Sequence, residues 1–489
     1  MVTLGLGFVR SVLLARFLAP EDFGAVALAL FFLAITSHLV DFGFAQALIQ
    51  RQEKVEEAAA THFILNLGTR VLKVAMVLSI VPLLRTIYYT EPRLVPTLLA
   101  FVAVDLVRVF TLTPSALMTK NLDFRRLAVL NVLSSVVMTG VALAMAWLGF
   151  GLWSLVGEQA GGVLTRAVVL NGIYRPWRLR LRTSWPLVKW YFRFGTHLLL
   201  SRGLSFLLNQ FDDFWAVTTL GYDAGGFYSK AYEYAGYPRR VIADPIMDVF
   251  FPTYAKVQND RERLSKTFFR VNSLVVRAGF LFSGTFALIA PEFVRIFPGE
   301  KWMPMVTTFQ FMLVYTLFDP LVASAGKLAV AVGRPEILTR VKAFQLAVFI
   351  PLVILLARYY VPLVTAAAVA LGYLGVYAQG IDGIAIAADV MLLLGVALLF
   401  WSVRPFVDYS LRRMFGWPLA GLVVSLAATI ALERAMVFSN DWIALTTKGG
   451  LFSVLYVGGL LLVERREYVQ NVRIVLNLLR RPEKQQVGS

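Results

Sequence analysis

The segment YRPWRLRLRTSWPLVKWYFR (174–193) divides the chain in two and determines how the rest of it is arranged. Basic residues and three tryptophans alternate along it, it contains no acid, and Pro176 and Pro186 disfavour one continuous helix across it. Because long apolar runs flank it, we interpret it as a cytoplasmic loop at the membrane interface, where Arg stems and indole rings suit the headgroup layer. A solvated loop that only follows the positive-inside rule is the alternative.

The composition is that of a membrane protein. Of 489 residues, 58% are hydrophobic and 16% are charged, whereas soluble domains average roughly 25% charged residues. The net charge of +17 then indicates loops that face an anionic leaflet, and we expect no nucleic-acid partner. The chain has no cysteine, which excludes disulfides and Cys-ligated metals.

Apolar windows of about 20 residues, the length needed to cross a bilayer, recur along the chain. They predict an all-α polytopic membrane protein with about 14 transmembrane helices. The predicted spans are 1–18, 24–48, 61–84, 94–118, 127–148, 150–173, 192–217, 226–252, 268–296, 304–331, 341–378, 384–402, 415–436 and 446–463.

The distribution of Lys and Arg orients these spans. With the N-terminus in the cytoplasm, the inside loops hold 26 basic residues and the outside loops hold only Arg85, Arg93 and Lys301. This asymmetry predicts that both termini are cytoplasmic. Two crossings within 341–378 would reverse every later loop, so we expect one net crossing there, either a long tilted helix or a span with an interfacial or re-entrant segment.

Basic residues within the predicted spans are the feature that points to function. Each costs roughly 2.5–3.5 kcal/mol at the centre of a lipid-facing helix, so it must face a wet cavity, pair or snorkel. Asp105 with Arg108 and Lys230 with Glu233 have the spacing of local ion pairs. The bases concerned are Arg10, Arg70, Lys73, Arg108, Arg202, Lys230, Arg239, Arg240, Arg277 and Lys327.

Four of these bases, Arg10, Arg70, Lys73 and Arg202, lack an oppositely charged neighbour in the sequence and are the candidates for an anion site. Arg70 and Lys73 are like-charged and three residues apart, so they should share an anion or an acid on another span. Snorkelling and structural pairing with acids on other spans are the alternatives.

Acids within or beside the spans are candidates for ion coupling. Asp212 and Asp213 are adjacent near the outer end of span 7, and Asp41 follows His38 by three residues. Paired carboxylates of which one has a raised pKa can take up a proton or a cation. A water-exposed helix end, or salt bridges to spans 1 and 8, is the alternative.

Enzyme motifs are missing from the sequence. There is no HExxH, P-loop or GxSxG pattern, and His38, His62 and His197 are too scattered to suggest a metal site. We therefore expect a protein that is not an enzyme and needs no cofactor.

Seven stretches are more specific than hydrophobic patterning. They are LLARFLAPEDFGAVALAL (13–30), DFGFAQALIQRQ (41–52), PSALMTKNLDFRRLAVLN (114–131), GFGLWSLV (149–156), LGYDAGGFYSKAYEYAGYP (220–238), FFPTYAKVQNDRERL (250–264) and APEFVRIFPGEKWMP (290–304). Together they resemble the polysaccharide-transport branch, with its Wzx-type lipid-linked oligosaccharide flippases, of the multidrug/oligosaccharidyl-lipid/polysaccharide (MOP) exporter superfamily.

The resemblance implies a MATE/MOP-like fold with two six-helix lobes around a central cavity. The lobes would be 1–173 and 192–402, joined by the basic cytoplasmic loop 174–191. Two further helices would occupy 403–463, and 464–489 would be a basic cytoplasmic tail. Spans 1, 2, 7 and 8 would form the gates of an alternating-access cycle. A weak repeat, LAPEDFG (18–24) and LGYDAGG (220–226), supports two halves.

The resemblance also implies a substrate, an undecaprenyl-pyrophosphate-linked oligosaccharide for O-antigen, capsule or exopolysaccharide biosynthesis. The expected location is the cytoplasmic (inner) membrane, with membrane lipids, H⁺ or Na⁺ and polysaccharide assembly proteins as further partners. Arg10, Arg70, Lys73 and Arg202 would then bind the pyrophosphate, and Asp41, Asp212 and Asp213 would couple transport to an ion. Relatives usually carry a short cytoplasmic leader, so the start of this chain is expected to be truncated or unusual.

Three other functions compete with this interpretation. An ion-coupled multidrug/cation antiporter of the same superfamily would favour acidic or aromatic cavities over basic ones. A polysaccharide polymerase or glycosyltransferase would need a large outer loop or a cytoplasmic nucleotide-sugar domain. A peptidoglycan-precursor flippase fits the quoted motifs less well.

The orientation can be tested in this cysteine-free chain. Single Thr90→Cys and Ser184→Cys variants should react with a membrane-impermeant maleimide from opposite sides of the membrane, because the charge asymmetry puts loop 85–93 outside and 174–191 inside. Labelling of both from one side would overturn the fourteen-span topology.

Overall fold

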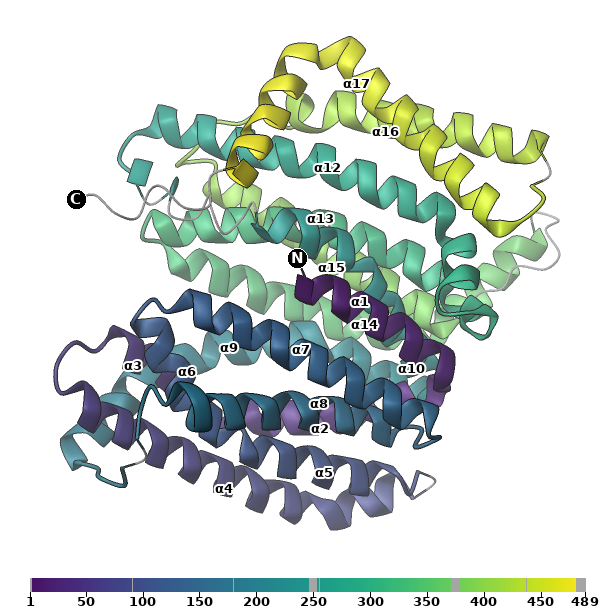
Figure 1. The fold of residues 1–489 in the computed structure, drawn as a ribbon. Coiled ribbons are helices and arrows are strands. Elements are labelled where there is room, and N and C mark those ends of the chain that lie inside the picture. The colour runs from purple at the N-terminus through teal and green to yellow at the C-terminus, as the bar shows by residue number, and fades with distance from the viewer. Residues whose placement is uncertain are drawn as a thin grey trace. The chain divides into compact units, whose positions relative to one another are not determined.

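The computed structural model describes residues 2–89, 91–178, 180–245, 253–254, 256–370, 379–436 and 438–480, with the backbone alone for 194–202, 242, 365–370 and 465–480. All regular elements in these ranges are helices (Figure 1). By its internal packing the chain divides into two compact units. Unit 1 is Met1–Ser229 with Val353–Ile384, and unit 2 is Lys230–Leu352 with Ala385–Ser489.

Unit 1 contains the first helices of the chain. They are α1 (Val2–Phe17), α2 (Pro20–Val40), α3 (Phe44–Gln50), α4 (Val55–Ile87), α5 (Leu94–Val107), α6 (Val109–Lys120), α7 (Phe124–Trp147), α8 (Trp153–Val168), the π-helix η1 (Val169–Tyr174), α9 (Trp185–Leu220) and the start of α10 (Tyr222–Ala235).

Unit 2 contains most of the remaining helices. They are η2 (Arg239–Ala243), α12 (Arg261–Ile296), η3 (Glu300–Met305), α13 (Val306–Ala331), α14 (Pro335–Ala370, which runs into unit 1), α15 (Gly380–Val403), α16 (Leu411–Ala435) and α17 (Asp441–Arg480). α17 is kinked at Glu464, whose φ of −122° and ψ of 33° are not helical.

In the described part of the chain, nine helices are long and apolar enough to cross a membrane, and α5 with α6 would make a tenth as one bent span. The chain is therefore a multi-pass, all-helical membrane protein, and the count of fourteen spans stays a prediction. α14 is one continuous helix through Arg358 and Pro362, which agrees with the long-helix alternative for 341–378. Residues 371–378 lie outside the described residues.

The basic segment is shorter as a loop than predicted. α9 begins at Trp185 rather than after residue 191, because Ser184 is extended and Pro186 occupies the first helical turn, where a missing N–H costs nothing. The segment also packs against the protein. The Arg51 guanidinium lies 4.8 Å from the centroid of the Trp190 ring, and the hydroxyl of the buried Tyr191 donates to the carbonyl of Ala58 at 2.9 Å.

Helix packing in unit 1 relies on close approach. α7 and α8 lie side by side (Figure 1), and Gly157, Gly161 and Gly162 of α8 face Met145, Val141 and Met138 of α7. Small residues four apart let two helices approach closely in a membrane, where contact area replaces the hydrophobic effect as the driving force.

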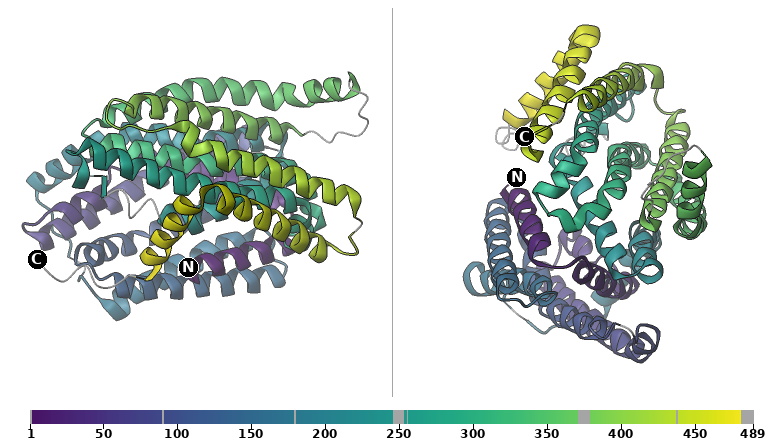
Figure 2. Two further views of the ribbon diagram at one scale, coloured as in Figure 1. Left: turned by 90° about the horizontal axis from the view of Figure 1, so that it is seen from above. Right: turned by 90° about the vertical axis from the view of Figure 1, so that its right-hand side faces the viewer.

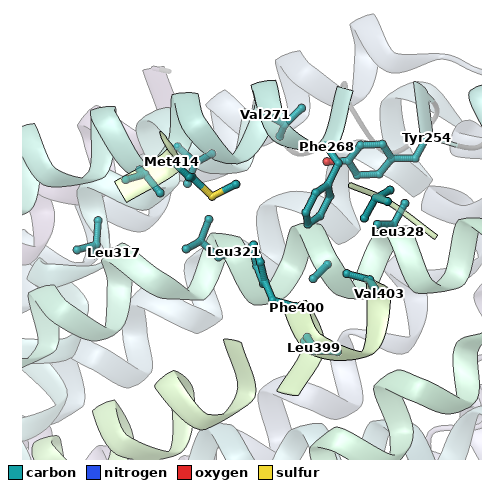
Figure 3. Packing of buried hydrophobic residues seen from close by; sticks show 14 of the residues in the cluster. Tyr254, Phe268, Val271, Leu317, Leu321, Leu328, Leu399, Phe400, Val403 and Met414 are labelled. Carbon is teal, nitrogen blue, oxygen red and sulfur yellow. The ribbon is translucent and has the colours of Figure 1, made fainter. Parts of the chain in front are cut away.

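The core of unit 2 is apolar and runs along α12. Phe268 and Val271 of α12 meet Leu321 of α13, Phe400 of α15 and Met414 of α16 in one buried cluster (Figure 3). α16 and α17 lie alongside α12 (Figures 1 and 2). The repeated packing of α12 against four helices makes it the central element of this unit.

The two repeated segments meet inside unit 1. A Cβ at Gly24, in the first turns of α2, would overlap the carbonyl oxygen of Tyr222, and a Cβ at Gly226 of α10 would overlap the carbonyl oxygen of Pro20. The backbone at the start of each helix therefore packs directly against the glycine of the other helix. The glycine that ends each of the segments 18–24 and 220–226 is accounted for by this reciprocal contact, since both positions need a residue without a Cβ.

Ala at Gly24 or Gly226 should separate the starts of α2 and α10 and destabilise the protein by about 1–3 kcal/mol, the usual cost of overpacking. Thermal unfolding in detergent measures the stability. Oxidative cross-linking of Glu21→Cys with Asp223→Cys, performed with and without each Ala substitution, measures the separation.

Gly68→Ala and Gly140→Ala are the matched controls, because a Cβ at either helical position meets open space. They should leave stability unchanged or raise it by about 0.5–1 kcal/mol. Equal effects at all four glycines would show that the reciprocal contact has no special role.

Candidate functional site

Arg70 and Lys73, two of the predicted anion-site bases, share one carboxylate. They lie one turn apart on α4, and both donate to Oδ2 of Asp105 on α5 at 2.5 Å. The Lys73 side chain is 2% exposed. The partner that these like charges require is therefore an acid on another helix, which stabilises both bases within the unit.

Arg10 also has an acidic partner. Its Nε lies 3.1 Å from Oε1 of Glu158 on α8, while its Nη1 is buried without a hydrogen-bond partner among the described residues. Arg202, the fourth predicted base, lies in α9, but its side chain falls outside the described residues. The structure thus brings Arg70 and Lys73 together and gives Arg10 a separate partner.

Embedded bases of unit 2 are paired in the same way. Lys230 donates to Glu233 at 2.7 Å, Arg239 donates to Asp319 at 2.5 Å, and Arg277 donates to Glu464 at 2.7 Å. The Lys230–Glu233 pair was expected from its spacing. The other two join distant parts of the sequence and serve packing in this unit.

A cavity of about 530 Å³ lies inside unit 1 between α3, α6, α7 and α8. Two arginines, Arg108 and Arg166, line it, and none of the described lining residues is acidic. Arg108 is the outermost base of the Asp105 cluster: its side chain is 43% exposed and its Nε is 4.0 Å from Oδ1 of Asp105. The other polar lining residues are Thr111, Ser115, Thr119 and Gln159.

Arg108 occupies a break between two helices. α5 and α6 meet there at 45°, and irregular backbone at membrane depth is tolerated where it lines a cavity. The bend turns α6 so that Thr111 and Ser115 follow Arg108 along the cavity wall.

The start of α6 is fixed by a side-chain donor. Pro114 has no N–H, so the carbonyl of Phe110 lacks its helical partner. Asn171, in the π-helix η1 that follows α8, supplies the missing donor at 3.0 Å and also donates to its own Ala167 carbonyl at 2.8 Å. This bond ties the arginine-bearing ends of α6 and α8 together.

The three predicted coupling acids have different environments. Asp41 ends α2 and accepts a hydrogen bond from the N–H of Gly43 at 2.9 Å. Asp212 of α9 is buried and accepts from the Tyr228 hydroxyl at 2.7 Å. The Oδ1 atoms of Asp212 and Asp213 are both buried and have no hydrogen-bond partner among the described residues, so this pair has unused capacity for a proton or a cation.

Sequence reasoning missed Glu158 and Arg166. Both lie within the predicted span 150–173, and the search for charges inside spans that found the other bases would have found them. Asn171 carried no such signal, because its role depends on a proline in another helix.

The comparisons with known proteins agree with this architecture. Residues 13–307 match a family model described as polysaccharide biosynthesis protein. The chain is 28% identical to the lipopolysaccharide biosynthesis protein WzxC of Escherichia coli K12, over 73% of this chain and 72% of that protein. It is 30% identical to the succinoglycan biosynthesis transport protein ExoT of Rhizobium meliloti, over 61% of this chain and 60% of that protein.

Two solved structures share the fold. The lipid II flippase MurJ in an inward closed conformation superposes with a TM-score of 0.69 and 13% identity, covering 95% of this chain and 97% of that one. An inward-facing MATE multidrug resistance transporter of the MOP superfamily gives a TM-score of 0.62 and 15% identity, covering 83% and 94%. The match over residues 13–307 shows that this chain belongs to the polysaccharide biosynthesis protein family, and the two structures show that it shares their fold.

Proposed function

We propose that this protein moves undecaprenyl-pyrophosphate-linked oligosaccharide across the cytoplasmic membrane, for O-antigen, capsule or exopolysaccharide biosynthesis. The observation that carries the proposal is the family match together with a cavity that holds two arginines and no described acid. The polyprenyl tail can stay in lipid while the headgroup crosses. The pyrophosphate is the hardest part to move, because its desolvation in hydrocarbon is prohibitive unless opposite charges surround it.

Alternating access is the mechanism that we propose, with spans 1, 2, 7 and 8 as gates. α2 packs along α9 in unit 1, with Phe31 stacked on Phe214 at 4.4 Å between ring centroids. The reciprocal glycine contact joins the starts of α2 and α10. Such dry contacts between gating helices can form and part as whole surfaces, and therefore suit two discrete states.

The sequence-predicted bases stay part of the proposal in a modified role. Arg10, Arg70 and Lys73 have acidic partners that reduce the charge each can offer to a pyrophosphate, and Arg202 is proposed from its position in α9 alone. We further propose an orientation with both termini in the cytoplasm, and polysaccharide assembly proteins as partners.

The competing function is an ion-coupled multidrug/cation antiporter, because the fold is shared with a MATE multidrug resistance transporter. A bare organic cation would meet two guanidinium groups in the unit 1 cavity, and the repulsion disfavours its binding. This function would instead use the acids of α9, so the two candidates differ in which charged residues their transport requires.

Reconstitution into proteoliposomes tests the proposal. Fluorescent undecaprenyl-diphosphate-linked glycan should move between leaflets and become accessible to an enzyme added outside, at a rate at least about tenfold above empty liposomes, which corresponds to about 1.4 kcal/mol in the barrier. Ethidium uptake, measured in the same vesicles, should equal that of empty vesicles. Ethidium transport without glycan movement would instead establish the antiporter.

Ion coupling is proposed to reside among Asp41, Asp212 and Asp213, and the unpartnered oxygens favour the α9 pair. Asp212→Asn and Asp213→Asn should each reduce the stimulation of glycan movement by a proton or Na⁺ gradient about tenfold, since a coupling energy of 1–3 kcal/mol corresponds to roughly 5–150-fold. Asp41→Asn keeps an acceptor for the Gly43 N–H, so a loss of ion dependence in that variant would report the missing charge and not the hydrogen bond. Unchanged ion dependence in all three variants would contradict the assignment.

A further inference from the structure

The cavity of unit 1 has the composition of a site for an amphipathic anion. Arg108 on the α5–α6 break and Arg166 on α8 line it from different helices. Two like charges that line one cavity, with no acidic side chain among the described lining residues, are stabilised when an anion lies between them. The uncompensated positive charge of the cavity therefore favours the binding of an anion.

The uncharged lining residues indicate which groups the ligand carries besides its anionic part. Thr111, Ser115 and Gln159 supply neutral donors beside the arginines, while Ile49, Leu112 and Met138 give the cavity an apolar side. The volume of about 530 Å³ falls within the usual 300–1,000 Å³ of small-molecule sites. Such a wall suits a phosphate or diphosphate ester that is attached to an apolar chain.

The surplus of charge singles out these two arginines from the other bases of unit 1. Asp105 accepts from Arg70 and Lys73 through Oδ2 at 2.5 Å, whereas Arg108 is 4.0 Å from its other oxygen. Arg166 donates to the neutral Asn131 amide oxygen. Arg108 thus shares a carboxylate that two other bases already bind, and Arg166 has no ion pair with an acid among the described residues, so positive charge around the cavity exceeds negative charge.

We propose that Arg108 and Arg166 form the first binding site for the diphosphate of the lipid-linked substrate, with the first isoprene units against the apolar wall. This inference rests on the proposed function and assigns the anion contact to different residues from those that the sequence alone suggested. The guanidinium groups can each take two diphosphate oxygens, which a lysine ammonium cannot do in the same geometry.

Direct binding tests the site independently of transport. Undecaprenyl diphosphate is titrated into the purified full-length protein in detergent and followed by native mass spectrometry. Arg108→Gln and Arg166→Gln should each weaken binding on the order of tenfold, and the double variant on the order of a hundredfold, because each removes charge-assisted hydrogen bonds. Arg108→Lys should recover part of the loss, since lysine keeps the positive charge but lacks the paired N–H donors of the guanidinium group.

Matched variants separate this site from general charge effects and from misfolding. Arg125→Gln removes an equal charge from the exposed start of α7 and should bind like the unmodified protein. Ser115→Phe keeps both arginines but fills the cavity, and it should weaken binding as the arginine variants do. Melting temperatures within a few degrees of the unmodified protein show that each variant is folded.

Titration with other phosphate compounds shows which kind of phosphate-bearing molecule the site binds. Phosphatidylglycerol and inorganic pyrophosphate, titrated separately, should bind at least about tenfold more weakly than undecaprenyl diphosphate. Equal affinity for phosphatidylglycerol would show a site for a membrane-lipid headgroup and overturn the proposal, as would unchanged binding in the double variant or no binding to the unmodified protein. Diphosphate binding that depends on both arginines, in a protein that moves no glycan, would refute the proposed function and leave this site in place.

Discussion

Unit 1 depends on the carboxylate of Asp105. Two bases of α4, Arg70 and Lys73, donate to one of its oxygens at 2.5 Å, and each base would otherwise cost roughly 2.5–3.5 kcal/mol at the centre of the membrane. Removing one partner of a buried ion pair leaves the other charge uncompensated, which costs about 3–5 kcal/mol. The position of α4 beside α5 is therefore fixed by charge as well as by apolar packing, and Arg108 is held where α5 ends.

Some bases of this protein are paired with an acid and stabilise the fold, whereas others keep a positive charge that a ligand could bind. Glu158 holds Arg10 and Glu464 holds Arg277, each with an oxygen within 3.1 Å of the guanidinium. Such pairs stabilise helix contacts but offer little net charge to a ligand. Around Asp105 three bases share one carboxylate, and in the described part of the chain Arg166 donates to a neutral amide oxygen, that of Asn131. Positive charge in surplus of the nearby acids is consequently carried by the two arginines that line the cavity.

Much of the helical arrangement could be predicted from hydropathy, and the site could be predicted only in part. The apolar windows 61–84 and 127–148 correspond to α4 (Val55–Ile87) and α7 (Phe124–Trp147), each of which begins before its window. α9 likewise begins within the predicted loop, where Pro186 suits its first turn. Local spacing found the Lys230–Glu233 pair. It could not find Arg10–Glu158, since those residues are joined by tertiary packing and hydropathy says nothing about which helices are neighbours.

The break at Arg108 shows that the position of a base along a bent span, and not its charge alone, decides whether it lines the cavity. A continuous helix would place successive residues around its whole circumference, and its backbone would be fully bonded. The bend of 45° turns α6 toward α3 and α8, and Pro114 frees the Phe110 carbonyl that Asn171 then binds. The hydrogen bond thus links the segment that follows Arg166 to the segment that follows Arg108. Because these two irregular helix ends are joined to each other, the backbone segments that carry Arg108 and Arg166 are held side by side, and the positions of the two arginines are set together.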